Sequence, residues 1–430
     1  MGGLAAQPSL ANPADRPVGA DVDDEVLLAR AFLTRIAEPA CIPLWGLVRR
    51  VGAVEAVRQI KAGIAADEVM RATAPRLAET DPHADLDIAQ RYGIRLIVPE
   101  SAQWPHFAMS ALERTGAARL REYENGKTTQ SEAGEDIPPL ALWVRGTAEL
   151  HSLGVRSVGI VGARAATAYG ERVAADLASG LGARGFPVVS GGAYGIDAAA
   201  HRGALAAGAG TVVVSAGGLD KPYPASNHRL FELAAETGLL VSESPPGAAP
   251  RRRRFLTRNR LIAALSTGCV IVEASTRSGA GNTATHCLKL GRHLMVVPGP
   301  VTSAMSAGCH DLLRKHEGTV RLVTNVADVV EHIGTLSELI ELSEPATADP
   351  RPADTAAAAA PADASLRQRL DALDATSRAL YDSFGARRSS TPEELVSASG
   401  QSIAEILRGL ALLEGAGLIE RRADGFRIVR

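Results

Sequence analysis

The chain of 430 residues is too long for one ordinary domain, so two or three domains are expected. Its formal net charge is only −2, which means that a polyanion would have to bind at a local basic patch. The four cysteines are scattered without a CxxC pair, which argues against a disulfide framework and a zinc site. No uninterrupted run of about 20 apolar residues is present. A soluble, cytoplasmic protein without a metal or cofactor is expected.

The amino-terminal part is predicted to be helical. Residues 1–22 are rich in Ala, Pro, Gly and Asp and predict a disordered tail. Apolar residues recur at helical spacing from Asp23 to Glu38 and from Leu47 to Gly63, with a break at Gly52. A small helical domain over residues 23–85 is therefore expected. A helix, glycine turn and helix can grip a nucleic-acid backbone as a helix-hairpin-helix, and a helical packing or interaction domain is the alternative.

Residues 86–335 alternate between strand and helix patterns. Strands are predicted at Ile94–Val98, Leu140–Val144, Ser157–Val161, Pro187–Ser190, Thr211–Ser215, Leu239–Ser242, Cys269–Val272 and His293–Val297. Helices are predicted to start near Ala168, Ile196, Asn227, Thr257 and Thr283. The polar stretch from Arg119 to Pro138 predicts an exposed insertion. The alternation predicts an α/β fold with a Rossmann-like, doubly wound, mostly parallel sheet.

The carboxyl-terminal part predicts a linker and a small module. Residues 336–366 are rich in Ala and Pro and predict the linker. In residues 367–430, Thr391 and Glu394 form a capping-box pattern, Ser402 with Glu405 repeats it, and residues 419–428 read as a hairpin. These features predict a winged helix-turn-helix. Its third helix, Ser402–Glu414, has one basic residue, so we expect this module to meet protein rather than DNA.

Four glycine-rich segments follow predicted strands and should meet at one edge of the sheet. They are Gly162-Ala163-Arg164, Gly191-Gly192-Ala193-Tyr194-Gly195, Gly217-Gly218 and Ser278-Gly279-Ala280-Gly281-Asn282. Glycines let the backbone approach a long or highly charged ligand, and a helix N-terminus can hold a phosphate. The sequence has neither the GxGxxG pattern with its later acidic residue nor GxxxxGK[ST], which disfavours NAD and P-loop nucleotides.

An arginine-rich run is the sharpest feature of the sequence. Residues 251–260 read RRRRFLTRNR and contain six arginines in ten residues. Arginines bind phosphates and Phe255 offers a stacking face, so nucleic-acid backbone binding is predicted; a solvated charged loop is the alternative. Asp197 and His201 lie four residues apart and are expected to fix a helix start rather than act as acid and base. Glu273 is either a base or a partner for loop amides. No nucleophile–base set is apparent, and no enzyme is expected.

Several long motifs resemble one family. They are VGIVGAR at Val158–Arg164, SGGAYGIDAAAHRGAL at Ser190–Leu205, GLDKPYPASN at Gly218–Asn227, ESPPG at Glu243–Gly247, RNRLIAALS at Arg258–Ser266 and VPGPVTSAMSAGCHDLL at Val297–Leu313. In this order they resemble the DNA-processing protein A family, DprA or Smf. The resemblance implies a single-stranded DNA-binding protein that helps load the RecA recombinase, notably in natural transformation, and that forms a homodimer.

The resemblance also implies a set of DNA-binding residues. Arg164 would contact a phosphate, with Asn227 and Arg258-Asn259-Arg260 near the same pocket. The full predicted set is Gly162, Arg164, Gly191, Gly192, Asn227, Arg251, Arg252, Arg253, Arg254, Arg258, Asn259, Arg260, Ser278 and Gly279. The chain departs from the family at Tyr194 and Ala225, where many relatives carry a basic residue, and in the loop at Arg277–Ala284.

Two other functions remain open from the sequence. The fold and glycine loop distantly resemble nucleoside-monophosphate phosphoribohydrolases of the "lonely guy" type. Their PGGxGTxxE motif is not matched, because the loop from Arg277 to Thr283 lacks the proline and the downstream acid. A winged-helix transcription factor with a nucleotide sensor domain is the weaker second alternative.

Overall fold

The computed structural model describes residues 22–152, 156–276 and 278–333, together with short stretches of the carboxyl-terminal module. Those stretches are 380–381, 383–384, 391, 394–395, 406, 410, 413, 418–422 and 425–428. The chain divides into two compact units, residues 1–346 and 347–430. Residues 1–21 of the predicted tail at 1–22, and the whole predicted linker at 336–366, lie outside the described residues. Each unit is described by itself.

A nine-stranded sheet forms the centre of the first unit, in the order β1-β2-β6-β5-β4-β3-β7-β8-β9. The strands are β1 (Ile94–Ile97), β2 (Leu142–Gly146), β3 (Val158–Val161), β4 (Val188–Ser190), β5 (Thr211–Ser215), β6 (Leu239–Ser242), β7 (Gly268–Ile271), β8 (His293–Val296) and β9 (Val320–Leu322). From β6 to β9 all neighbours are parallel, whereas β2 runs antiparallel to both β1 and β6. The predicted doubly wound, mostly parallel α/β sheet is confirmed.

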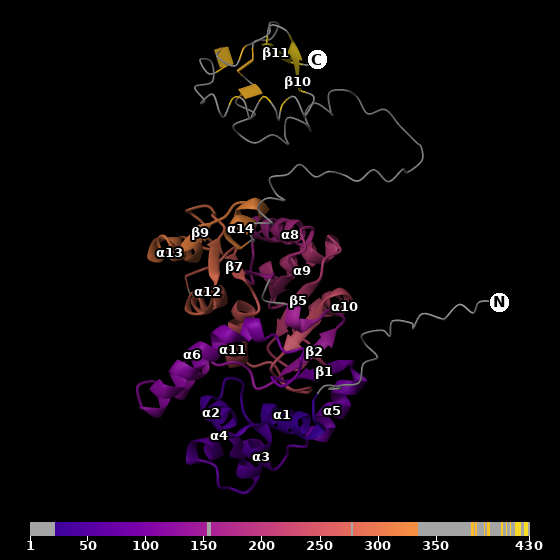
Figure 1. Ribbon diagram of the computed structural model, residues 1–430, viewed down its shortest axis with the longest axis vertical. Helices are drawn as coiled ribbons and strands as arrows, with labels where there is room; N and C mark the ends of the chain where they lie inside the picture. Colours follow the sequence, from indigo (N-terminus) through magenta and orange to yellow (C-terminus); the bar gives the residue numbers. More distant parts are fainter. Residues whose placement is uncertain are drawn as a thin grey trace, which may run out of the picture. The chain divides into compact units, whose positions relative to one another are not determined.

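Helices cover both faces of this sheet (Figure 1). They are α6 (His106–Glu124), α7 (Gln130–Gly134), α8 (Ala168–Gly182), α9 (Ile196–Ala206), α10 (His228–Thr237), α11 (Arg252–Ala264), α12 (Gly279–Lys289), α13 (Ala307–Lys315) and α14 (Val326–Ile333), with short 3₁₀ turns η2 (Leu150–Ser152) and η3 (Ala225–Asn227). Side chains alternate along each strand. In β3, Val158 and Ile160 pack with α8 and α9, whereas Val161 belongs to the core formed with α6, α11 and α12.

Five helices precede the sheet in the chain. They are α1 (Asp24–Ile36), α2 (Ile42–Val51), α3 (Ala53–Lys61), α4 (Asp67–Leu77) and α5 (Pro82–Arg91). The predicted break at Gly52 separates α2 from α3, and this glycine has a φ of 84°, which side-chain-bearing residues rarely adopt. Helix α1 packs on the sheet, where Trp143 donates a hydrogen bond to Thr34 over 3.3 Å. These helices share one compact unit with the sheet. A domain boundary at residue 85 stays a prediction.

Several predicted details are wrong. The stretch from Arg119 to Pro138 is exposed only in part, chiefly at residues 124–127 and 129–130, whereas α6 continues to Glu124 and Asp136 and Ile137 are buried. Asp136 accepts from Arg119 and Lys289, at 2.9 and 3.2 Å, which compensates its burial. Strand β9 was not predicted. Helix α11 begins at Arg252 instead of near Thr257, and α12 at Gly279 instead of near Thr283.

The second unit has a small apolar core and a hairpin. Strands β10 (Ile419–Arg422) and β11 (Gly425–Ile428) pair antiparallel, as predicted for the wing. The predicted capping box is present: the Thr391 amide donates to Glu394 over 3.2 Å, and the Glu394 amide donates to the Thr391 hydroxyl over 3.3 Å. Ile406, Leu410 and Leu413 are buried, whereas Ser402, Glu405 and most of the predicted third helix lie outside the described residues. The winged helix stays a prediction.

Within the described ranges, none of the helices combines the length and the apolar character needed to cross a membrane.

Candidate nucleic-acid interface

The main pocket lies where the order of the sheet reverses. The connection from β3 leads to β4 on one side, and the connection from β7 leads to β8 on the other. Ligands of open α/β sheets bind at such a switch point, outside the carboxyl ends of the strands. A pocket of about 660 Å³ occupies this place. It is lined by Val161, Gly162, Ala163, Arg164, Ala165, Ala193, Asp197, Arg252, Phe255, Leu256, Arg258, Asn259, Ile262, Ser275, Ser278, Gly279, Ala280, Thr283 and Met305. We call it the switch-point pocket.

The loop after β3 brings Arg164 to the mouth of this pocket. Gly162 is required there, because a Cβ would lie 2.6 Å from Ile196 and 2.9 Å from the Glu273 carbonyl oxygen. Glu273 fixes the start of α8, since its carboxylate accepts from the Thr167 amide at 2.9 Å and from the Thr167 hydroxyl at 2.6 Å. The sequence left Glu273 as either a base or a partner for loop amides, and these contacts show the second role. Arg164 is exposed, and its guanidinium lies 4.9 Å from the centre of the Phe255 ring.

The loop after β4 is held from inside by Arg258. This side chain is only 6% exposed and donates to the carbonyls of Gly191, at 2.8 Å, and Val214. A Cβ on Gly191 would lie 2.5 Å from the Arg258 guanidinium, so this glycine makes room for the arginine. Gly192 has a φ of 67°, and Asn227 donates to its carbonyl over 3.1 Å. Burial lowers the pKa of Arg258 to about 10, so it remains charged at neutral pH.

The N-terminus of α12 opens onto the pocket. Ser278 caps the helix by accepting from the Gly281 amide at 3.4 Å. Asn259 anchors the same turn through its amide group, which donates to the Gly279 carbonyl at 3.3 Å and to Asn282 at 3.1 Å. Gly279 is exposed, and no atom lies within 4 Å of the place that its Cβ would take. The positive end of the α12 dipole is therefore accessible to an anion.

The structure separates the six arginines of the run. Arg252 and Arg258 line the switch-point pocket, and Arg253 is exposed. Arg251 and Arg254 turn toward Glu38, which follows α1. Arg260 is fully buried: its guanidinium donates to both Glu243 oxygens at 2.8 Å and to the Ile137 carbonyl at 2.9 Å. Arg260 was predicted to contact DNA. Its burial conflicts with that prediction, because no part of the side chain reaches the surface.

Two further predicted sites do not reach the pocket. Gly217 and Gly218 are covered by the segment from Pro245 to Pro250, and the Gly218 amide donates to the Ala248 carbonyl at 2.8 Å. This loop therefore does not line the switch-point pocket. Asn227 stabilises the neighbouring loop but is itself buried.

Asp197 and His201 lack the geometry of an acid–base pair. Asp197 accepts from the Ala193 amide over 3.4 Å, and burial raises its pKa above the ordinary value. His201 contacts the Thr211 hydroxyl through Nδ1 at 2.8 Å, and burial lowers its pKa to about 3. Each residue thus serves a separate structural contact. In the part of the chain that the structure describes, no group of three His, Cys, Asp or Glu side chains could hold a metal ion.

Phe255, which was predicted as a stacking face, belongs to an aromatic rim beside the pocket, and the two tyrosines of this rim were not predicted. Tyr223 meets Phe255 edge to face, with ring centres 5.9 Å apart, and Tyr194 accepts a hydrogen bond from Ser226 over 3.0 Å. Both tyrosines are about half exposed, at 49% and 48%. Aromatic residues make up only 4% of the chain, so three of them near glycine loops and the arginine run were a usable signal.

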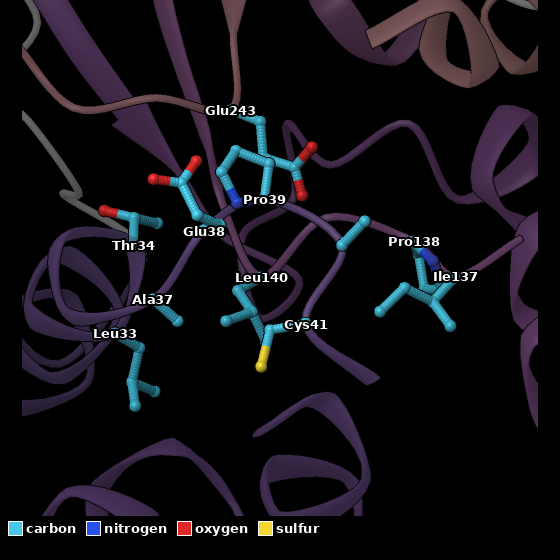
Figure 2. A pocket seen from close by; sticks show the side chains of 11 residues that line it. Leu33, Thr34, Ala37, Glu38, Pro39, Cys41, Ile137, Pro138, Leu140 and Glu243 are labelled. Carbon is cyan, nitrogen blue, oxygen red and sulfur yellow. The ribbon is translucent and has the colours of Figure 1, made fainter. Parts of the chain in front are cut away.

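A second cavity lies at the end of α1, and Figure 2 shows its lining side chains. Leu33, Leu140 and Cys41 form an apolar wall, and Glu38 and Glu243 stand at the opposite side. Its volume of about 10 Å³ is at the limit for one water molecule. It is therefore too small to bind a nucleotide.

Comparison with known proteins identifies the family of the chain. The family model for DNA recombination-mediator protein A matches residues 126–334. A DNA processing protein DprA of Mycobacterium tuberculosis is 44% identical over 407 residues, which is 95% of each chain. The chain belongs to the DprA family. Its role is therefore that of a recombination mediator in DNA processing, and the phosphoribohydrolase alternative gains no support.

Another DprA protein matches a shorter part of the chain in sequence. DprA of Streptococcus pneumoniae is 38% identical over 192 residues, which is 45% of this chain and 66% of that protein. Its X-ray structure matches with a TM-score of 0.56 at 24% identity, over 73% of this chain and 99% of that one. This likeness shows that the two proteins share a fold.

Proposed function

We propose that the switch-point pocket binds single-stranded DNA through its phosphates. The observation that carries this proposal is the exposed Arg164, stacked on Phe255 beside the open N-terminus of α12. A guanidinium can bind a phosphate with two hydrogen bonds, and the helix amides add unpaired donors in the same concavity. Arg252 supplies a further positive charge to this pocket.

The aromatic rim favours a single strand over a duplex. Phe255, Tyr223 and Tyr194 can stack only with bases that are unpaired and turned outward. Phosphate contacts carry no sequence information, and stacking accepts every base. We therefore expect little sequence selectivity.

The biological role that we propose extends beyond the pocket. The chain protects single strands and helps to load the RecA recombinase in the cytoplasm, as in natural transformation, and it acts as a homodimer. Family membership supports this role. The proposal includes no catalytic step, and release of free base from a nucleotide would contradict that part.

A gel-shift titration tests the proposal. Single-stranded and duplex oligonucleotides of the same sequence are compared with the full chain over a salt series. We expect tighter binding of the single strand, and log affinity should fall with log salt by about 0.7 for each phosphate bound. Equal or tighter binding of the duplex at moderate salt would contradict the proposal.

A further inference from the structure

A second basic cavity lies behind the first turn of α11. Its volume is about 260 Å³, and it is bordered by α1, α4 and the segment after β6. Arg251 and Arg254 line this cavity, whereas Arg252 lines the switch-point pocket. The first turn of α11 therefore stands between the switch-point pocket and this second cavity. We call the cavity of about 260 Å³ the junction cavity. It is lined by Thr34, Arg35, Ala37, Pro39, Arg76, Ser244, Pro245, Gly247, Ala248, Ala249, Arg251 and Arg254.

One carboxylate serves three arginines at this cavity. Arg254 donates to the two oxygens of Glu38 at 2.8 and 2.9 Å, and it donates to the Ala249 carbonyl at 2.9 Å. Arg76 also forms an ion pair with Glu38, and Arg251 lies 3.8 Å from the same carboxylate. Burial works to raise the pKa of Glu38, but Arg254 and Arg76 together hold it below its ordinary value. Glu38 is therefore an anion placed among guanidinium groups.

The positive charge at the junction cavity exceeds the negative charge. Arg35, the fourth arginine of the lining, is paired with the buried Asp85 and also donates to the Pro246 carbonyl at 2.5 Å. Four guanidiniums thus face two carboxylates, which leaves a surplus of two positive charges. A simple ion-pair network between helices would need no such surplus, because like charges repel one another. The side chain of Arg251 is 67% exposed and that of Arg76 31% exposed, so solvent reaches both.

The Glu38 carboxylate points toward these arginines and not toward the apolar wall of the cavity drawn in Figure 2. Figure 2 shows it turned away from Leu33, Leu140 and Cys41. In this position it is paired with three arginines of the junction cavity. A phosphate carries the same charge type and would use the same guanidinium donors.

We propose that the junction cavity binds a phosphate group of the nucleic-acid strand that occupies the switch-point pocket, and that Glu38 competes with this phosphate for Arg76 and Arg251. This inference rests on the proposed function. The two concavities are separated by one helix, whose diameter is about 10–12 Å, so one strand can cross α11 and fill both. The amino-terminal helices thereby become part of the DNA-binding surface through Arg76 of α4.

The test compares two double variants with equal charge loss. Arg76→Gln with Arg251→Gln removes the two most exposed arginines of the junction cavity. Arg49→Gln with Arg71→Gln removes two exposed arginines of α2 and α4 that do not line it. For a single strand of about 20 nucleotides, we expect the junction variant to bind about tenfold more weakly and its salt slope to fall by about 0.7. The control variant should stay within about twofold of wild type.

Glu38→Gln separates a binding role from a structural one. This substitution keeps the shape and removes the competing charge, so single-strand affinity should rise about threefold. A purely structural role of Glu38 predicts no gain. Unchanged or weakened binding of the folded variant, or a junction variant that binds like the control, would overturn the inference.

The failure of this inference can be told apart from failure of the proposed function. If wild type binds single strands and Arg164→Ala reduces that binding while the junction variant does not, only the junction cavity is refuted. If wild type does not bind single strands at all, the switch-point pocket and the junction cavity are both refuted. A thermal unfolding curve for each variant verifies that it is folded.

Discussion

Replacing Arg164 with alanine should weaken single-strand binding more than alanine at any one of the four arginines from 251 to 254. Arg164 is exposed at the mouth of the switch-point pocket, and its loop is fixed by Gly162 and by the Glu273 contacts. A charge-assisted hydrogen bond contributes about 1.5–3 kcal/mol, which corresponds to a loss of roughly 10- to 150-fold in affinity. The tandem arginines can replace one another as phosphate contacts. Arg254 already donates hydrogen bonds to Glu38 and to the Ala249 carbonyl. For each of them we expect a loss below about fivefold.

Fluorescence anisotropy with a labelled single strand at fixed salt measures this difference. Arg172→Ala serves as the control, because Arg172 is an exposed arginine of α8 that pairs with Asp176 and does not line the pocket. It should bind like wild type. An Arg164→Ala protein with unchanged unfolding temperature and unchanged affinity would refute the assignment of Arg164 as a phosphate contact.

Three further outcomes follow from the structure. Glu243→Gln leaves the Arg260 guanidinium buried without its counter-charge, so urea unfolding should show a loss of about 3–5 kcal/mol; a loss below 1 kcal/mol would contradict this. Burial lowers the pKa of His201 to about 3 and that of His286 to about 4, whereas the unfolded chain binds these protons near pH 6.5. The free energy of unfolding should therefore fall as the pH drops from 6.5 to 5, by up to about 1.4 kcal/mol per pH unit for each histidine, and equal stability at pH 7 and 5 would refute it. Deleting the residues after 365 should reduce single-strand affinity by less than about tenfold, or 1.4 kcal/mol, because the pocket lies in the first unit; a folded truncation that no longer binds in the anisotropy assay would contradict this.

Strands β1 to β8 were predictable because each is a short apolar run between turn residues, whereas β9 has only three residues with Arg321 at its centre and was missed. The start of α11 was not. Arg252 and its two following arginines occupy the first turn, where the positive end of the helix dipole disfavours cations. The carboxylate that offsets part of this charge is Glu38, more than 200 positions away in the chain. No local pattern reveals such a partner, so the sequence indicated a later start near Thr257.

The same limit applies to the stretch from Arg119 to Pro138. Its polar composition indicated exposure, but Asp136 is buried because Arg119 and Lys289 neutralise it. Lys289 comes from α12, far along the chain. Composition predicts exposure correctly only where a charged side chain lacks a distant partner of opposite sign.

The arginine run shows why a count of charges does not locate a binding surface. Arg258 and Arg260 are two residues apart on α11, yet both are buried, and they stabilise different parts of the fold. Arg258 joins the ends of β4 and β5 through two carbonyls, whereas Arg260 joins α11 to the end of β6 through Glu243. Planar guanidinium groups suit these tasks because one side chain can bond two acceptors in fixed directions. The buried arginines of this chain therefore stabilise the elements around the switch-point pocket. Only arginines whose side chains reach solvent remain available to contact a phosphate.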